Sequence, residues 1–147
     1  MTAATDRSVR RDRSTEPAGP GDVVPGRPTV AICALTFDRP VGLDAMLAGL
    51  AALEVADVDV RVVIVDNDTS GGARATVESW RERMPWELRY EVEPMRGIPF
   101  GRNRAVRSAG AVDHIAFLDD DEVPEPGWLA ELLRVQHLTG ADVVTGR

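Results

Sequence analysis

The stretch His114-Ile115-Ala116-Phe117-Leu118-Asp119-Asp120-Asp121-Glu122 joins an apolar run to four consecutive carboxylates. A short apolar run predicts a buried strand, so the acids would follow its carboxyl end, where open α/β sheets bind ligands. Neighbouring carboxylates repel by roughly 4 kcal/mol at about 4 Å and a dielectric of about 20, so water or a cation must compensate them. Oxygen ligands favour Mg²⁺ or Mn²⁺. The simpler interpretation is a solvated acidic turn.

Apolar runs alternate with helical patterns over the rest of the chain. The expected strands cover residues 29–36, 58–65, 88–92, 114–118 and 141–145. The expected helices cover residues 40–53, 73–84, 100–109 and 126–139, with Asp38 as a candidate cap for the first. This alternation predicts an α/β fold with a doubly wound, mostly parallel sheet. Because the last strand stops at Arg147, we expect the sheet to be incomplete at its carboxyl end.

Composition separates a tail from a single domain. Residues 1–28 are rich in Arg, Pro, Gly, Ser and Thr, and we expect them to be disordered, with one domain over residues 29–147. The net charge of −7 argues against a nucleic-acid partner. All 17 basic residues are Arg, and the absence of Lys excludes a P-loop and Schiff-base chemistry. The lone Cys33 lies in an expected strand and is predicted to be a buried, inert thiol.

Further polar groups fall at the same edge of the expected sheet. Asp66 and Asp68 follow the second strand. Arg96 lies in the loop before the third helix, and Arg102 and Asn103 lie at the start of that helix. The carboxyl ends of parallel strands share one edge, so these groups should converge with the acid run. Acids for a metal and guanidinium groups for phosphates suit a nucleotide diphosphate. Taken singly, each Arg is better explained by a surface ion pair, and only together with the acids do the arginines favour a phosphate site.

The order of these motifs resembles the N-terminal, nucleotide-sugar-binding half of family 2 inverting glycosyltransferases. The motifs are Ile-Val-Asp-Asn-Asp at 64–68, Glu-Pro-Met-Arg-Gly at 93–97, Gly-Arg-Asn-Arg-Ala at 101–105, Phe-Leu-Asp-Asp-Asp-Glu at 117–122 and Pro-Gly-Trp-Leu at 126–129. The resemblance implies the Rossmann-like GT-A fold. It also implies transfer of a sugar from a nucleotide-diphosphate-sugar, UDP-linked in our expectation, to a saccharide or lipid-linked acceptor in polysaccharide or cell-surface glycan synthesis. The full enzyme would be cytoplasmic, with peripheral association at the inner face of the cell membrane.

The resemblance also implies roles on the base side of the site. Asp66 would accept the N3–H of the base, and Thr36 would line the same pocket. Arg102 would contact the base or the phosphates, and Asn103 would brace its loop. Asp68 would hold these residues in position within the donor site.

On the metal side, the resemblance makes Asp119 and Asp121 the DxD motif that holds Mn²⁺ or Mg²⁺, with Asp119 also toward the ribose. Asp120 would support them within the donor site. The metal would neutralise charge on the leaving nucleotide diphosphate. The general base of this family lies in its second half, which we expect beyond Arg147, so no catalytic base is assigned.

Three other interpretations stay open at this point. Asp66-Asn67-Asp68-Thr69 also resembles the nucleophile motif of haloacid-dehalogenase-type phosphatases, and Asp119-Asp120 their metal-binding pair, although those enzymes commonly use a Lys. A receiver-like signalling domain normally needs a Lys as well. The third interpretation is a non-catalytic fragment that binds the donor and transfers nothing.

Overall fold

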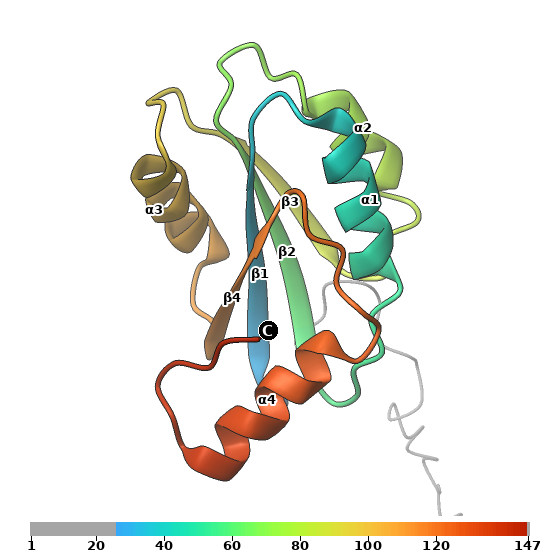
Figure 1. Cartoon of the computed structure of the whole chain (residues 1–147), viewed down its shortest axis with the longest axis vertical. Helices are drawn as coiled ribbons and strands as arrows, with labels where there is room; N and C mark the ends of the chain where they lie inside the picture. Colours follow the sequence, from blue (N-terminus) through green and yellow to red (C-terminus); the bar gives the residue numbers. More distant parts are fainter. Residues whose placement is uncertain (1–25, 147) are drawn as a thin grey trace, which may run out of the picture.

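The computed structural model describes residues 26–146, which form a parallel sheet with helices on both faces (Figure 1). The predicted tail lies outside the described residues except for 26–28. In chain order the elements are β1 Thr29–Thr36, α1 Pro40–Ala51, β2 Asp59–Asp66, α2 Arg74–Trp80, β3 Glu87–Val92, α3 Ile98–Ala109, β4 His114–Asp119 and α4 Trp128–Thr139. The predicted α/β alternation is therefore confirmed.

The four described strands lie in the order β3-β2-β1-β4, and every pair is parallel. The register pairs Thr36 with Asp66 and Leu35 with Asp119. The carboxyl ends of β1, β2 and β4 therefore lie side by side at one edge of the sheet. This is the arrangement that the sequence predicted for its polar groups.

The central strands β1 and β2 are mostly apolar because helices cover both of their faces. Helices α1 and α2 lie on one face and α3 on the other (Figure 1). On the first face α1 buries Leu43, Met46, Leu47 and Leu50 completely. On the second face Cys33 is fully buried, and burial raises the pKa of its thiol to about 12. The predicted inert thiol fits this environment.

The helices differ from the predicted ones mainly at their ends. Asp38 does not cap α1: Arg39 is the N-cap residue, and no side chain makes a capping hydrogen bond. Helix α2 ends at Trp80, because the amides of Arg81 and Arg83 already bond to carbonyls three residues back. Within residues 26–146, none of the helices combines the length and the apolar character needed to traverse a bilayer.

The predicted fifth strand at 141–145 is wrong. Residues 141–146 contain no strand, and Val143 is 79% exposed. A β-branched run becomes a strand only where a neighbouring strand accepts its backbone hydrogen bonds, and this run pairs with none of the described strands. Helix α4, just before it, lies beside the amino ends of the strands and fully buries only Leu129 (Figure 1).

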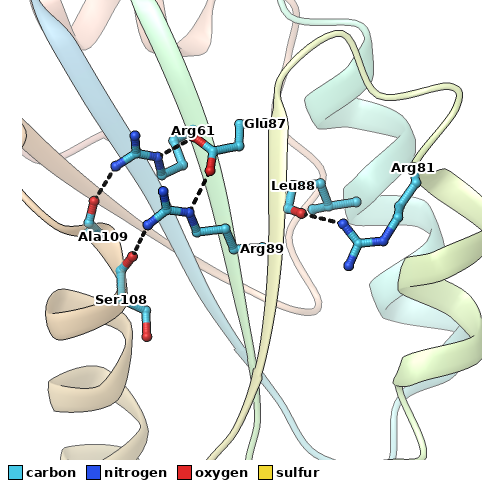
Figure 2. Close-up of polar contacts among 7 residues, drawn as sticks. All are labelled: Arg61, Arg81, Glu87, Leu88, Arg89, Ser108 and Ala109. Carbon is cyan, nitrogen blue, oxygen red and sulfur yellow. Dashed lines mark hydrogen bonds and ion pairs between the residues drawn. The ribbon is translucent and has the colours of Figure 1, made fainter. Parts of the chain in front are cut away.

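A polar network anchors the carboxyl end of α3 to the sheet (Figure 2). Arg61 on β2 donates to the Ala109 carbonyl at 2.5 Å, and Arg89 on β3 donates to the Ser108 carbonyl at 2.7 Å. Glu87 accepts from the Nε atoms of both arginines, each at 2.6 Å. Cations are favourable at this end of a helix because its last carbonyls carry partial negative charge. The network thereby fixes α3, whose other end faces the ligand edge.

Glu87 should make this anchor sensitive to acid. Burial opposes its charge, but the hydrogen bonds from Arg61 and Arg89 outweigh burial and hold its pKa below the usual 4.5. A lowered folded-state pKa contributes stability above the unfolded value, and this stability is lost as the pH falls through the folded value. We expect Glu87→Gln to cost about 1 kcal/mol of unfolding free energy near neutral pH and less at about pH 3.

Urea unfolding at the two pH values measures this difference. Glu131→Gln, which removes an exposed ion pair within α4, is the control and should have the smaller effect near neutral pH. An equal loss for Glu87→Gln at both pH values would show that its charge contributes nothing.

Candidate functional site

A cavity of about 450 Å³ opens at the carboxyl ends of β1 and β4. Its walls come from the strand ends, the turns that follow them and the first turns of α3. The lining residues are Leu35, Thr36, Phe37, Arg39, Asn67, Ile98, Arg102, Phe117, Leu118, Asp119, Asp120 and Asp121. This volume is in the range of small-molecule sites, and its place is the ligand edge of a doubly wound sheet.

The acid run forms one side of the cavity, and arginines face it. Arg39 Nη1 lies 2.8 Å from Asp121 Oδ2 and 3.3 Å from Asp120 Oδ1. Arg102 Nη2 lies 3.9 Å from Asp119 Oδ1. Three of the four carboxylates of the run, those of the aspartates, therefore have a guanidinium within ion-pair distance. Arg102 was predicted from the sequence and Arg39 was not, although the position of Arg39 three residues after β1 places it at the same edge.

Thr36 is the last residue of β1 and lines this cavity. Its residue is only 3% exposed, and its Oγ1 has no hydrogen-bond partner among the described residues. A buried hydroxyl left unpaired costs about 1–3 kcal/mol, so such groups usually have a partner. The Thr36 hydroxyl is thus a buried hydrogen-bond donor and acceptor at the cavity wall, where a ligand could pair with it.

Asp66 is buried in a hydrogen-bond network of its own and does not line the cavity. It is 1% exposed. Oδ1 accepts the Asp68 amide at 3.0 Å, and Oδ2 accepts the Ala73 amide at 3.0 Å and the Tyr90 hydroxyl at 2.8 Å. Burial and this carboxylate both raise the pKa of Tyr90. In this structure Asp66 organises the loop between β2 and α2, and its contact with a base stays a prediction.

Asp68 also lies outside the cavity lining. It accepts hydrogen bonds from the hydroxyl and the amide of Ser70, and these lower its pKa. Both predicted acids after β2 are therefore engaged within their own loop.

Asn67 braces the loop before α3, a role that was predicted for Asn103. Its Nδ2 donates to the carbonyls of Glu93 and Met95 at 2.9 and 2.8 Å, and its Oδ1 accepts the Gly97 amide at 2.7 Å. Asn67 thereby ties the end of β2 to the loop before α3. Asn103 is exposed, and its side chain bonds to no other described residue.

Two guanidinium groups stack on aromatic rings at the cavity mouth. Arg102 lies over Phe117 at 5.2 Å, and Arg96 lies over Phe37 at 4.2 Å. Both rings line the cavity, as does Arg102, while Arg96 stands outside its lining. Stacking of this kind holds a cation in place without using its N–H donors. Arg102 therefore keeps its donors available for an anionic ligand.

The oxygen donors of the acid run fit a divalent cation. Among residues 26–146, no three His, Cys, Asp or Glu side chains form a ready metal cluster. Mg²⁺ is, however, usually held by one or two carboxylates, with substrate phosphates and water as its other ligands. Asp120 and Asp121 already converge on a single cationic nitrogen of Arg39. The acid run can thus share one cation between two carboxylates.

A parallel sheet with acids and arginines around a cavity at its carboxyl edge defines an α/β protein of the GT-A type. The chain belongs to glycosyl transferase family 2, whose model matches residues 31–147. The family resemblance noted in the sequence is thereby confirmed. Membership in this family also sets aside the phosphatase interpretation. Asp66, its proposed nucleophile, is buried with both oxygens engaged.

One relative is the succinoglycan biosynthesis protein ExoM of Rhizobium meliloti, 38% identical over 118 residues, which are 80% of this chain and 37% of that protein. The structure is similar to S. aureus TarS 1–349 (TM-score 0.67, 20% identity, 81% of this chain and 37% of that one). It is also similar to the mannosyltransferase PcManGT from Pyrobaculum calidifontis in complex with GDP-Man and Mn²⁺ (TM-score 0.65, 22% identity, 75% and 32%). These structural likenesses show the fold alone. The chain spans about a third of the length of each relative.

Proposed function

We propose that this chain is the donor-binding part of a glycosyltransferase that uses a UDP-linked sugar and Mn²⁺ or Mg²⁺. The acceptor in this proposal is a saccharide or lipid-linked saccharide, and the full enzyme acts in polysaccharide synthesis at the cytoplasmic face of the membrane. The observation that carries the proposal is the cavity where the unpaired Thr36 hydroxyl, the acid run and Arg102 meet. The relative in succinoglycan biosynthesis supports the acceptor class. TarS complexes with UDP and UDP-GlcNAc, and the GDP-Man complex with Mn²⁺, support the donor class.

In this proposal the two ends of the cavity bind different parts of the donor. Thr36 pairs with a polar edge of the base through its free hydroxyl, and Ile98 and Phe37 supply apolar walls beside it. Arg102, held on Phe117, donates to the diphosphate. Asp119 and Asp121 hold the cation, with Asp119 toward the ribose. When bound, the cation neutralises the charge that develops on the departing nucleotide diphosphate.

Thermal unfolding of the chain with UDP, GDP or no nucleotide, each with and without Mn²⁺, tests the proposal. A ligand at about 100 times its dissociation constant stabilises by about 2.7 kcal/mol, which shifts the midpoint by several degrees. We expect the largest shift with UDP and Mn²⁺ together. If the chain unfolds cooperatively and no nucleotide changes the midpoint, donor binding is contradicted. A larger increase of the midpoint with GDP than with UDP would show that the donor carries guanine and not uracil.

Thr36→Val should separate stability from binding. The substitution removes the unpaired hydroxyl at nearly constant volume, so the free chain should gain about 1 kcal/mol of unfolding free energy. The affinity for UDP with Mn²⁺ should fall by about tenfold, because the base loses its partner. Urea unfolding and calorimetric titration measure the two quantities.

The matched control is Thr29→Val, at the other end of β1. The Thr29 hydroxyl donates to Asp113 at 2.8 Å, so its loss should lower stability and leave UDP affinity unchanged. If Thr36→Val binds UDP as tightly as the unmodified chain does, Thr36 has no part in the donor site.

A further inference from the structure

We propose that Arg39 is a resident counter-ion of the acid run, paired with Asp120 and Asp121, and that it competes with the divalent cation for Asp121. The inference rests on the metal-assisted donor binding proposed above and goes beyond it. In the free chain the guanidinium occupies the place between the two carboxylates. A metal that uses the Asp121 carboxylate must first displace it.

The contacts of Arg39 support this role. One nitrogen, Nη1, reaches both carboxylates, at 2.8 Å to Asp121 and 3.3 Å to Asp120. The Asp120 side chain is only 10% exposed, whereas that of Arg39 is 56% exposed. The acid is therefore held in the fold, and the arginine covers it from the solvent side. Such a partner can leave without disturbing the core.

Helix α1 holds Arg39 over the acid run. Arg39 is the N-cap residue of α1 and is followed directly by Pro40 at the first helical position. One turn further, a Cβ built at Gly42 would lie 2.6 Å from the Asp120 carbonyl oxygen, so the helix backbone touches the acid turn here. The amino end of α1 and the acid turn thus form one packed unit. The guanidinium reaches the acids because of this contact, although they are 81 and 82 residues away in sequence.

The pairing with Arg39 reduces electrostatic repulsion within the acid run. Residues 119–122 place four carboxylates in one turn, and like charges at short distance destabilise each other. Arg39 compensates two of them while no metal is bound. Because it is a single charge in an exposed position, a divalent cation with phosphate ligands can replace it. In the absence of nucleotide, metal binding should consequently be weaker than it would be if Asp121 had no paired arginine.

Titration of the full 147-residue chain with Mn²⁺ in the absence of nucleotide tests the competition. Arg39→Gln removes the competing charge, and we expect its affinity for Mn²⁺ to rise by about three- to tenfold. The matched control is Arg134→Gln, an arginine of similar exposure, 58%, that pairs with Glu131 on α4. This control should bind Mn²⁺ as the unmodified chain does. Circular dichroism establishes that each variant is folded.

Arg39→Lys keeps the charge and should stay within about twofold of the unmodified chain. This variant also tests the inference if Arg39→Gln does not fold. A three- to tenfold rise in the Mn²⁺ affinity of Arg39→Lys would show that the charge of Arg39 does not compete with the metal. Equal or weaker Mn²⁺ binding by a folded Arg39→Gln would overturn the inference but leave donor binding intact. Absence of Mn²⁺ binding by every variant, with or without UDP, would overturn both the inference and the proposed metal.

Discussion

Asp66→Asn should lower the free energy of unfolding by about 3 kcal/mol, which is a large part of the stability of a small domain. The carboxylate accepts three hydrogen bonds in a site that is 1% exposed. An amide has one accepting oxygen, so either orientation turns an NH₂ group toward at least one buried N–H donor. A donor facing a donor leaves both unpaired, and this costs more than a lost contact. Urea unfolding gives the value directly.

Tyr90→Phe is the matched control for this variant. It removes one of the three donors and keeps the carboxylate, so it should cost only about 1 kcal/mol. The pair also tests the predicted contact between Asp66 and the base. If Asp66→Asn stays as stable as the unmodified chain but loses UDP affinity, Asp66 serves the ligand and its structural role is wrong. A loss of stability with UDP affinity retained in the folded fraction contradicts the base contact.

Gly42→Ala should disrupt the donor site from outside the cavity. The new Cβ would lie 2.6 Å from the carbonyl oxygen of Asp120, and neither backbone can yield without moving the acid turn. We expect UDP binding with Mn²⁺ to weaken by at least about tenfold and the unfolding free energy to fall by about 1–3 kcal/mol. Alanine normally stabilises a helix relative to glycine, so a loss at this position points to the contact. Calorimetric titration and urea unfolding measure both effects.

Gly127→Ala controls for the Gly42 substitution. Gly127 directly precedes α4, and a Cβ at this position would meet nothing within 4 Å. Its stability and its UDP affinity should change little. If Gly42→Ala behaves like Gly127→Ala, the acid turn does not depend on its contact with α1.

The sheet could be predicted from the sequence because its strands are continuous apolar runs. Strands β1 and β2 lie between two helical layers, so most side chains in them are apolar. The sequence also placed Thr36, Asp66 and Asp119 at one edge, since parallel strands end together. Periodicity alone cannot show whether a run finds a partner strand, and for this reason the strand at 141–145 was predicted wrongly.

The finer arrangement of the site depends on contacts between distant segments. A carboxylate at a strand end can face the cavity or the following loop, and Asp66 faces the loop because the Ala73 amide and Tyr90 meet it there. Arg39 resembles an ordinary surface arginine until the fold brings its partners next to it. Asn67 is likewise recognised only through the carbonyls of the loop that it contacts.

The central claim is that a nucleotide diphosphate and a divalent cation bind in the cavity at the carboxyl edge of the sheet. Amide correlation spectra of the isotope-labelled chain, recorded with UDP and Mg²⁺ and then with Mn²⁺ in its place, test it most directly. We predict that UDP with Mg²⁺ shifts the amides around Thr36, Asn67 and Arg102, and that Mn²⁺ broadens those of residues 117–121 first. The amides of α2 and α4 should stay unchanged. Shifts centred away from this edge, or broadening that does not include the acid run, would contradict the claim.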